Sequence, residues 1–253
     1  MKDIILEQLK EIEKDHNVRI LLAVESGSRA WGFASTDSDY DVRFIYVRPK
    51  EEYLRLDEVR DVIELPINND LDINGWDLQK TLRLLYQSNP TLFEWFSSPI
   101  IYMETPFADA FREMMLEYFS RKKGMFHYIS MAEHNNREFL KGDMVKVKKY
   151  FYVLRPILAC HWIMDKMTPP PMLFKDLMEA ELPEHLKNEV DNLLELKMNS
   201  PEIKMIPKVE VLNAYIDEEI DVIKTAASET EQNKNTEWDR LNQFFLSVLA
   251  DEK

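Results

Sequence analysis

The chain has 253 residues, and its 32 Lys and Arg against 46 Asp and Glu give a net charge of −14 at neutral pH. Such an acidic chain is unsuited to coat nucleic acid over its whole surface, because affinity for phosphate needs clustered Lys and Arg, so any contact with RNA is expected to be local. The one cysteine, Cys160, excludes an intramolecular disulfide and a zinc site built from several cysteines. No apolar run reaches the roughly 18 residues that span a bilayer, and the N-terminus lacks the basic and apolar regions of a signal peptide. We therefore expect a cytoplasmic protein without a membrane partner.

The first hundred residues combine helical and strand patterns. Residues 1–15 carry apolar side chains at helical spacing, and residues 18–24 form a short, partly β-branched apolar run that predicts a buried strand. Strand character returns at residues 40–47, 61–67 and 71–74. These segments predict one small mixed sheet.

The pattern becomes helical after the last predicted strand. Leu78, Leu82 and Leu85 predict an amphipathic helix that ends before Asn89-Pro90, because a proline ring breaks the helical hydrogen-bond ladder. From residue 107 onward nearly all segments have helical periodicity. These patterns predict an α+β fold in which a mixed-sheet domain over residues 1–106 precedes an all-helical domain over residues 107–253.

The most informative stretch lies between the first two predicted strands. An apolar strand leads into Gly27 and Ser28, a loop with a second glycine follows, and Asp39 and Asp41 then open the next strand. A glycine directly after a strand lets the backbone approach a phosphate closely, and the Ser28 hydroxyl lies beside backbone N–H groups that an anion can use. The loop therefore predicts a cradle for a triphosphate.

The two acids after this loop predict a metal site. Residues two apart on a strand point to the same face, so Asp39 and Asp41 are expected to project together. Carboxylates this close repel one another unless a cation lies between them, and Mg²⁺ prefers such oxygen ligands, with Mn²⁺ as a possible substitute. Two such ions can polarise an attacking hydroxyl and stabilise a leaving pyrophosphate. A third acid is expected on a neighbouring strand: Asp72 is favoured, and Asp77 is the alternative, although its position before a helix is typical of an N-cap.

The spacing of these residues resembles that of a known superfamily. Gly27-Ser28, ten further residues and then Asp39-Tyr40-Asp41-Val42 resemble the signature of the DNA polymerase β superfamily of nucleotidyltransferases. Longer strings resemble a narrower bacterial and phage family of nucleotidyltransferases associated with RNA repair and RNA ligases: Gly-Ser-Arg-Ala-Trp-Gly (27–32), Ser38-Asp39-Tyr40-Asp41, Gly75-Trp76-Asp77-Leu78, Asn89-Pro90, Glu94-Trp95 and residues 149–156. The resemblance extends from about residue 20 to residue 165.

This resemblance implies an enzyme that moves a nucleoside monophosphate from an NTP to a hydroxyl group and releases pyrophosphate. It implies a palm-like catalytic domain and a helical domain that closes the nucleotide cleft. By this resemblance Gly27 and Ser28 hold the triphosphate, and Asp39 and Asp41 hold the metal ions. Asp72, from its place on a neighbouring strand, is expected to be the third ligand and to assist deprotonation of the attacking hydroxyl. The association with RNA repair favours an RNA end as the acceptor. A protein or small-molecule hydroxyl is the alternative acceptor, and a regulatory module that binds nucleotide without turnover is the alternative from another class.

A basic segment over residues 141–155 provides local positive charge on the acidic chain and is expected to be a helix. Lys148, Tyr152 and Arg155 lie at i, i+4 and i+7 and hence on one helical face. This face predicts contacts with the NTP or with RNA, and a solvated basic face is the alternative. Arg29, directly after the predicted phosphate loop, is expected to reach the triphosphate, with a surface ion pair as the alternative.

Overall fold

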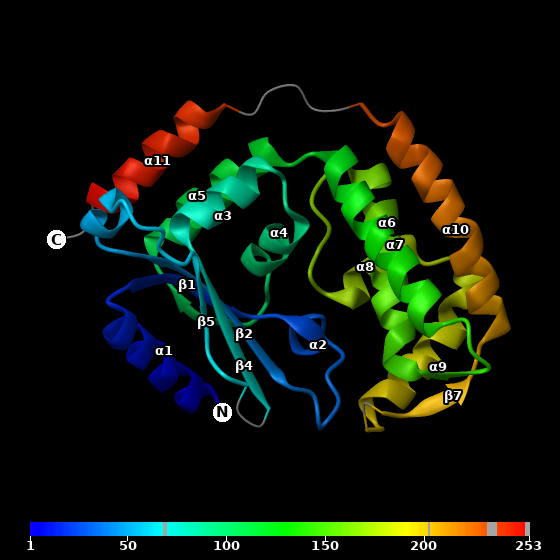
Figure 1. Ribbon diagram of the computed structural model, residues 1–253. Coiled ribbons are helices and arrows are strands. Elements are labelled where there is room, and N and C mark those ends of the chain that lie inside the picture. The colour runs from blue at the N-terminus through cyan, green and yellow to red at the C-terminus, as the bar shows by residue number, and fades with distance from the viewer. Residues whose placement is uncertain (68–69, 202, 232–236, 251–253) are drawn as a thin grey trace. The chain divides into compact units, whose positions relative to one another are not determined.

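The computed structural model describes residues 1–67, 70–201, 203–231 and 237–250 (Figure 1). The contacts among these residues divide the chain into two units. The first unit consists of the described residues of segments 1–27, 39–118 and 237–250. The second unit consists of residues 28–38 and the described residues of segment 119–231. The two units therefore alternate along the chain, and the loop between Gly27 and Asp39 groups with the second unit.

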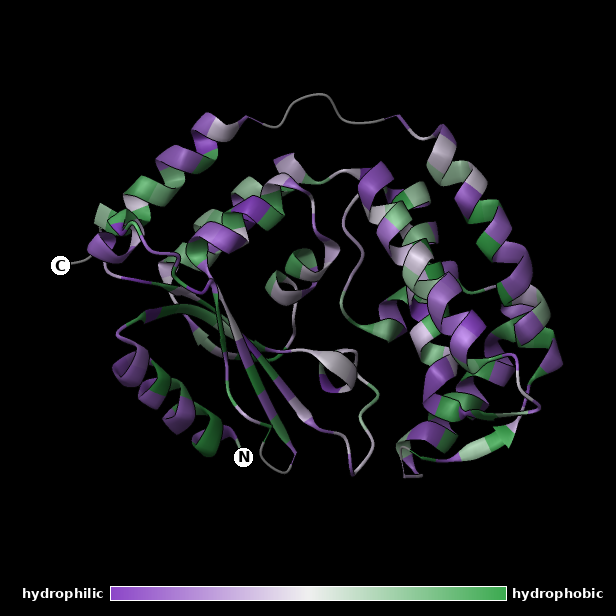
Figure 2. Ribbon diagram, in the orientation of Figure 1, coloured by the Kyte–Doolittle hydropathy of each residue, from purple (hydrophilic) through white to green (hydrophobic). Residues whose placement is uncertain are grey.

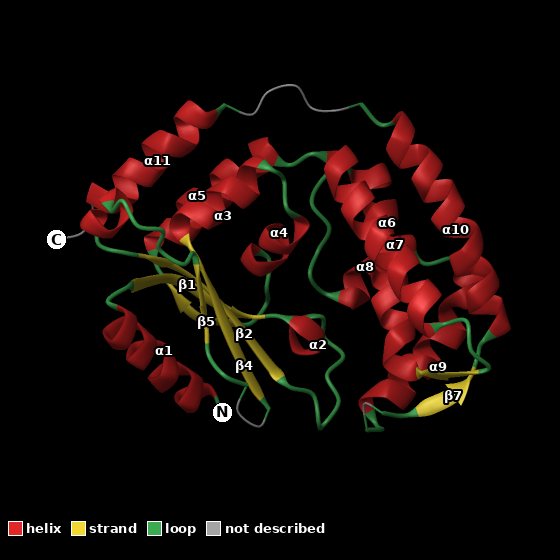
Figure 3. Ribbon diagram, viewed as in Figure 1, coloured by secondary structure: helices red, strands yellow, loops and turns green. Residues whose placement is uncertain are grey.

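A five-stranded mixed sheet forms the centre of the first unit (Figure 3). Its strands, in spatial order, are β3 (Val62–Glu64), β4 (Leu71–Asp77), β2 (Tyr40–Val47), β1 (Arg19–Glu25) and β5 (Ile101–Glu104). Strands β2 and β4 run parallel, and the other neighbouring pairs run antiparallel. The small mixed sheet predicted from the sequence is confirmed.

Helices pack on both faces of this sheet. The helices of the first unit are α1 (Lys2–His16), α3 (Leu78–Tyr86), α4 (Pro90–Phe96), α5 (Pro106–Tyr118) and α11 (Trp238–Ala250), with a 3-10 helix η1 (Lys50–Leu54). Helix α1 covers one face, and α3, α4 and α5 contact strands from the other side (Figure 1). The predicted amphipathic helix is α3, and its residues Leu78, Leu82 and Leu85 are buried as expected.

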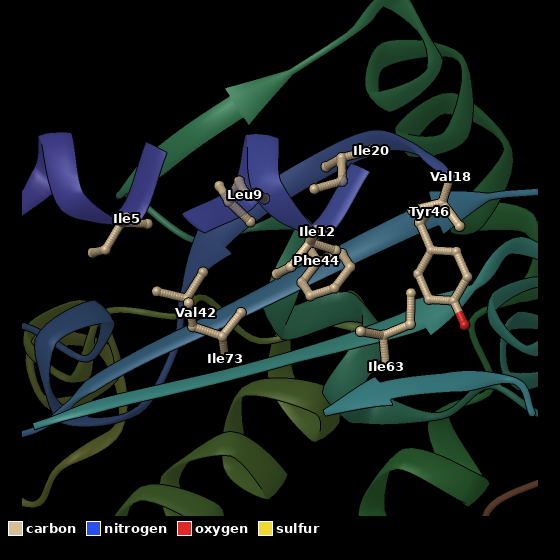
Figure 4. Packing of buried hydrophobic residues seen from close by; sticks show 11 residues of the cluster. Ile5, Leu9, Ile12, Val18, Ile20, Val42, Phe44, Tyr46, Ile63 and Ile73 are labelled. Carbon is tan, nitrogen blue, oxygen red and sulfur yellow. The ribbon is translucent and has the colours of Figure 1, made fainter. Parts of the chain in front are cut away.

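The core between α1 and the sheet determines which way the strand residues point. Along α1, hydrophobic and hydrophilic residues alternate at helical spacing (Figure 2). Figure 4 shows the apolar side chains of α1 against those of the strands: Ile5, Leu9 and Ile12 against Val42, Phe44, Tyr46, Ile63 and Ile73. Burying each such side chain stabilises the fold by about 1.5–3 kcal/mol. Because Val42, Phe44 and Tyr46 face α1, the alternate residues Asp41 and Arg43 point to the opposite face.

Three strands differ from the predictions. Strand β3 covers Val62–Glu64, although a strand was predicted over residues 61–67. Strand β4 continues beyond residue 74 because Gly75 makes room for the ring of Phe44: a Cβ at Gly75 would lie 2.2 Å from that ring. Strand β5 was not predicted, since its burial is incomplete and its hydrophobic pattern is short.

The second unit is mostly helical (Figure 3). Its helices are α6 (Arg121–Phe139), α7 (Val147–Lys166), α8 (Phe174–Glu181), α9 (Lys187–Met198) and α10 (Glu210–Glu229), with a 3-10 helix η2 (Glu184–Leu186). The antiparallel pair β6 (Met144–Lys146) and β7 (Met205–Pro207) was not anticipated. Cys160 is fully buried in α7, where burial raises the pKa of its thiol. The predicted α+β class is confirmed, with one small strand pair added to the helical part.

Candidate active site

Two carboxylates lie next to each other on the sheet face opposite α1. Asp41 of β2 and Asp72 of β4 are register partners in the parallel pair, so their side chains leave the sheet on the same face. Their chain neighbours Val42 and Ile73 point the other way, into the core. The side chains of the two acids are 30% and 32% exposed. The sheet thus brings together two of the predicted metal-binding acids and leaves both accessible to solvent.

Gly27 lies against one of these acids. It follows β1 with a φ angle of +59°, in the left-handed region that favours glycine. A Cβ atom at this position would lie 2.1 Å from Oδ2 of Asp41. The backbone N–H of Ser26 also donates a hydrogen bond to the carbonyl oxygen of Asp41 at 2.8 Å. Glycine is therefore required here by the carboxylate itself, a reason that the sequence did not reveal.

Arg43 is a site residue that the sequence did not identify. Its Nη2 lies 2.7 Å from Oδ2 of Asp72 and 3.1 Å from Oδ1 of Asp41, so one guanidinium is shared by the two carboxylates. Its Nη1 donates to the carbonyl oxygens of Val42 and Asp72 at 3.0 and 3.1 Å. These four contacts fix the position and orientation of the Arg43 guanidinium. The signal in the sequence was its position two residues after Asp41, on the same strand face.

Glu25 is a second residue that the sequence did not single out for the site. Its carboxylate is fully buried at the end of β1. Its Oε1 accepts the backbone N–H of Asp41 at 2.7 Å, and its Oε2 accepts the hydroxyl of Tyr102. A buried carboxylate needs such donors to offset its loss of hydration. Glu25 therefore positions the backbone at Asp41 rather than contacting a substrate. The feature of the sequence that could have identified it is an acid at the end of an otherwise apolar strand.

Asp39 lies outside the strand that carries Asp41. It directly precedes β2, which begins at Tyr40, and its side chain is exposed. The argument that Asp39 and Asp41 share a strand face therefore does not apply to it. In the described part of the chain, no three acid, histidine or cysteine side chains are arranged to hold a metal ion. The carboxylate oxygens nevertheless suit Mg²⁺ in kind, and Arg43 supplies the positive charge between Asp41 and Asp72.

Asp77 occupies the far end of β4. It lies five positions after Asp72, which corresponds to about 16 Å along a strand. As predicted, it is the N-cap of α3: its Oδ1 accepts the backbone N–H of Gln79 at 2.7 Å, while its Oδ2 accepts the hydroxyl of Tyr53 at 2.9 Å. Burial raises its pKa, although these hydrogen bonds oppose that shift. Asp77 lines a separate pocket of about 570 Å³ together with Arg48 and Tyr53.

The loop after Gly27 is organised within the second unit. Ser28 and Arg29 belong to the one-turn helix α2 (Gly27–Ala30). The Nη2 of Arg29 donates to the carbonyl oxygen of Ser38 at 2.6 Å, so Arg29 spans the loop. The ring of Trp31 makes an edge contact with Tyr152, with ring centroids 5.7 Å apart. The loop is thus packed into the helical part rather than extended into solvent.

The basic segment is helical only in part. Helix α7 begins at Val147, so Lys141 and Lys146 are not on it, because residues 144–146 pair with β7 instead. The predicted helix over residues 141–155 is wrong in this respect. Lys148, Tyr152 and Arg155 do lie on α7, but Arg155 is only 2% exposed and its guanidinium lies 4.8 Å above the ring of Trp31. The half-buried Lys148 and Tyr152 remain partly accessible.

Comparison with known proteins identifies the family of the chain. The family described as the RNA repair pathway DNA polymerase beta family matches residues 1–247. The chain belongs to this family. The resemblance inferred from the Gly27-Ser28 and Asp39-Tyr40-Asp41 strings is thereby confirmed, and membership in the RNA repair pathway DNA polymerase beta family extends well beyond the region in which those strings lie.

Two individual proteins resemble this member of the RNA repair pathway DNA polymerase beta family. "Uncharacterized protein YcgL" of Bacillus subtilis (strain 168) is 48% identical over 253 residues, which cover 99% of this chain and 97% of that protein. A crystal structure of a nucleotidyltransferase-like protein from Exiguobacterium sibiricum 255-15 aligns with 98% of this chain and 81% of its own, at 11% identity and a TM-score of 0.37. Across the described residues, no helix combines the length and apolar character needed to cross a membrane.

The Gly75–Leu78 string, one of those by which the chain resembles its family, consists of residues with structural roles. Gly75 makes room for the ring of Phe44. Trp76 stacks on Trp95 of α4, with ring centroids 3.8 Å apart. Asp77 caps α3, and Leu78 is fully buried. The Gly75–Leu78 string therefore joins β4 to its neighbours, while the candidate chemistry lies at the other end of the strand.

Proposed function

We propose that this protein is a metal-dependent nucleotidyltransferase that moves a nucleoside monophosphate from an NTP to an RNA end and releases pyrophosphate. The observation that carries the proposal is the pairing of Asp41 with Asp72 beside the start of the loop at Gly27. Membership in a family described by an RNA repair pathway supports RNA as the acceptor.

Each candidate residue has an assigned task in this proposal. Asp39, Asp41 and Asp72 would hold Mg²⁺, and Gly27 and Ser28, with Arg29, would hold the triphosphate. Bound Mg²⁺ supplies a Lewis acid that lowers the pKa of an attacking hydroxyl and offsets negative charge on pyrophosphate. The choice of Asp72 over Asp77 is supported by the register, because Asp72 lies opposite Asp41 whereas Asp77 lies opposite Tyr46.

Arg43 engages one oxygen of each carboxylate. It contacts Oδ2 of Asp72 and Oδ1 of Asp41. A carboxylate held through one oxygen keeps its other oxygen in a defined direction, where it can bind a cation or accept the proton of a hydroxyl. Arg43 therefore acts as an orienting residue for both acids.

The start of α7 supports an anionic substrate. Burial first, and the neighbouring charges of Lys148 and Lys146 next, lower the pKa of Lys149. Apart from that shift, three lysines lie within four residues here, Lys146, Lys148 and Lys149, and a nearby anion would offset their positive charge. A triphosphate or an RNA backbone would supply that anion. For this reason we keep Lys148, Tyr152 and the buried Arg155 in the proposed NTP-binding or RNA-binding face.

The direct test is nucleotidyl transfer by the purified protein. It is incubated with each labelled NTP, with Mg²⁺ or Mn²⁺, and with RNAs that carry defined 3′ and 5′ ends, tRNAs, protein substrates and aminoglycosides. We expect label on an RNA end together with pyrophosphate release. The matched control is the Asp39→Ala, Asp41→Ala double variant.

The outcomes separate the alternatives. Equal transfer by the double variant and the parent would reject the assignment of the acids. Label on protein or on an aminoglycoside would favour the second acceptor class. Nucleotide binding without pyrophosphate release under any condition would favour the regulatory module over an enzyme.

A further inference from the structure

A buried lysine in the last third of the chain contacts the loop that follows Gly27. Lys197 lies near the end of α9, and only 4% of it is exposed. Its Nζ donates to the hydroxyls of Ser35 and Ser38 at 3.3 and 3.2 Å. These partners lie 162 and 159 positions away in the sequence. No role in the site was predicted for this part of the chain.

The two serines form a closed turn. Both side chains are buried, and their hydroxyl oxygens lie 3.0 Å apart. The backbone N–H of Ser35 donates to the hydroxyl of Ser38 at 3.0 Å, and the backbone N–H of Ser38 donates to the carbonyl of Ser35 at 3.2 Å. The Lys197 ammonium therefore caps a turn whose internal hydrogen bonds already fix the spacing of the two serines.

This turn is connected to two residues that have a role in the proposed reaction, one before it and one after it in the chain. The carbonyl oxygen of Ser38 accepts a hydrogen bond from Arg29 at 2.6 Å. The next residue along the chain is Asp39. The turn thus holds the guanidinium assigned to the triphosphate and begins the segment that leads to the metal-binding acids.

The chemistry of the position favours a specific role for the ammonium. Lysine is rarely buried, because desolvating its charge is costly. The Phe33 ring, whose centroid lies 5.6 Å from Nζ, already packs against Phe151 and Phe174 with centroids 5.0 and 5.5 Å away. The hydrogen bonds that the ammonium donates to Ser35 and Ser38 offset part of this cost.

From these contacts we infer that Lys197 is a positioning residue for nucleotidyl transfer, acting through the Ser35–Ser38 turn on Arg29 and Asp39. The inference rests on the function proposed above. It gives α9 a role in the active site that does not require Lys197 to touch the substrate. A well-placed loop matters because a displacement of about 1 Å at a reacting group can lower a rate about 100-fold.

The test compares Lys197→Met with Lys187→Met, which makes the same change at a partly exposed lysine of the same helix. Amide hydrogen exchange of peptides covering residues 28–38 is measured in both variants and in the parent. We expect exchange in this segment to become at least about tenfold faster in Lys197→Met only, because local opening is easier without the ammonium. Exchange in the five-stranded sheet should remain that of the parent.

Turnover provides the second readout, well below the unfolding temperature of each variant. We expect kcat/KM for NTP to fall about 30-fold or more in Lys197→Met and to stay within about twofold of the parent in Lys187→Met. Ser38→Ala should lower kcat/KM as well. The Lys197→Met, Ser38→Ala double variant should be little worse than Lys197→Met alone, because residues that act through one contact are not additive.

Each possible result bears on the inference. Unchanged exchange over residues 28–38, or parental turnover in Lys197→Met, would overturn it while leaving the proposed function intact. Full additivity with Ser38→Ala would also overturn it, since Lys197 would then act elsewhere. A parent protein without turnover on any acceptor would reject the proposed function itself, and this inference with it.

Discussion

Nη2 of Arg43 lies 2.7 Å from Oδ2 of Asp72 on the neighbouring strand, and the same nitrogen contacts Asp41. The guanidinium therefore holds two like-charged groups together on a partly exposed sheet face. A metal ion that binds these acids has to share them with Arg43. The proposed metal binding by the acid pair would thus be linked to the stability of the sheet through one side chain.

Replacing Arg43 with methionine should lower the free energy of unfolding by about 1–2 kcal/mol in the absence of divalent metal, because charge-assisted hydrogen bonds are lost and Asp41 and Asp72 repel. Urea denaturation measures this change. Arg55→Met removes an exposed arginine that also contacts two carboxylates and should change stability little. Mg²⁺ should stabilise Arg43→Met more than the parent; equal stabilisation of both would contradict the shared-site interpretation.

Gly27→Ala should damage both stability and activity. Its Cβ would meet Oδ2 of Asp41, and its φ angle is unfavourable for alanine. We expect the free energy of unfolding to fall by about 1–3 kcal/mol and kcat/KM to fall about 100-fold or more. Gly142→Ala is the control, since its nearest neighbour would be Met144 O at an ordinary 3.5 Å. Full activity in Gly27→Ala would show that the close approach to Asp41 does not matter for turnover.

Asp72→Asn and Asp77→Asn make the same change at two positions of one strand. Asp72→Asn should lower kcat by more than about 100-fold, because even changes around metal ligands cost about 10–100-fold. Asp77→Asn should retain turnover within a few-fold, because asparagine also caps helices well. Steady-state kinetics with the preferred NTP and acceptor measures both. The reverse order of effects would make Asp77 the third acid.

The pH dependence of stability should reveal the buried carboxyl of Asp77. Burial raises its pKa above the usual 3.8 in the folded protein. The folded state then binds more protons than the unfolded state between these two values, so this group makes the protein less stable as the pH rises through that window. We expect the stability of the parent relative to Asp77→Asn to fall as the pH rises from 3.8 and to level off above the folded pKa. A difference that grows in favour of the parent would contradict this assignment.

Strand periodicity was sufficient to predict four of the five strands of the sheet and to place Asp41 on the face opposite Val42. The alternation of Val42 and Phe44 with polar neighbours is a local property, and so is the position of Asp72 between two apolar residues. The contact of Arg43 with Asp72 is different, because it depends on the register of two strands and joins residues 29 positions apart along the chain. Periodicity defines faces, but the register also depends on long-range packing.

The packing of the loop over residues 28–38 could not be predicted from local sequence patterns. Phe33, Ser35 and Ser38 find their partners on helices far along the chain, and one partner is a buried lysine. Sequence reasoning treats lysine and arginine as surface residues, since they are rarely buried. Lys197 and Arg155 both depart from that rule and are buried.

Gly75 packs against Phe44 for reasons of folding alone, so it can be retained in evolution independently of the residues that carry the proposed chemistry. A descendant that lost Asp72 would still need Gly75 for that ring, Trp76 for Trp95 and Asp77 for the start of α3. It would keep the string by which such chains are recognised and yet be unable to perform the reaction proposed here. A genome survey that searches for Gly-Trp-Asp-Leu strings therefore finds proteins with this fold. To find those able to perform the proposed reaction, it must also require an acid three residues before the glycine.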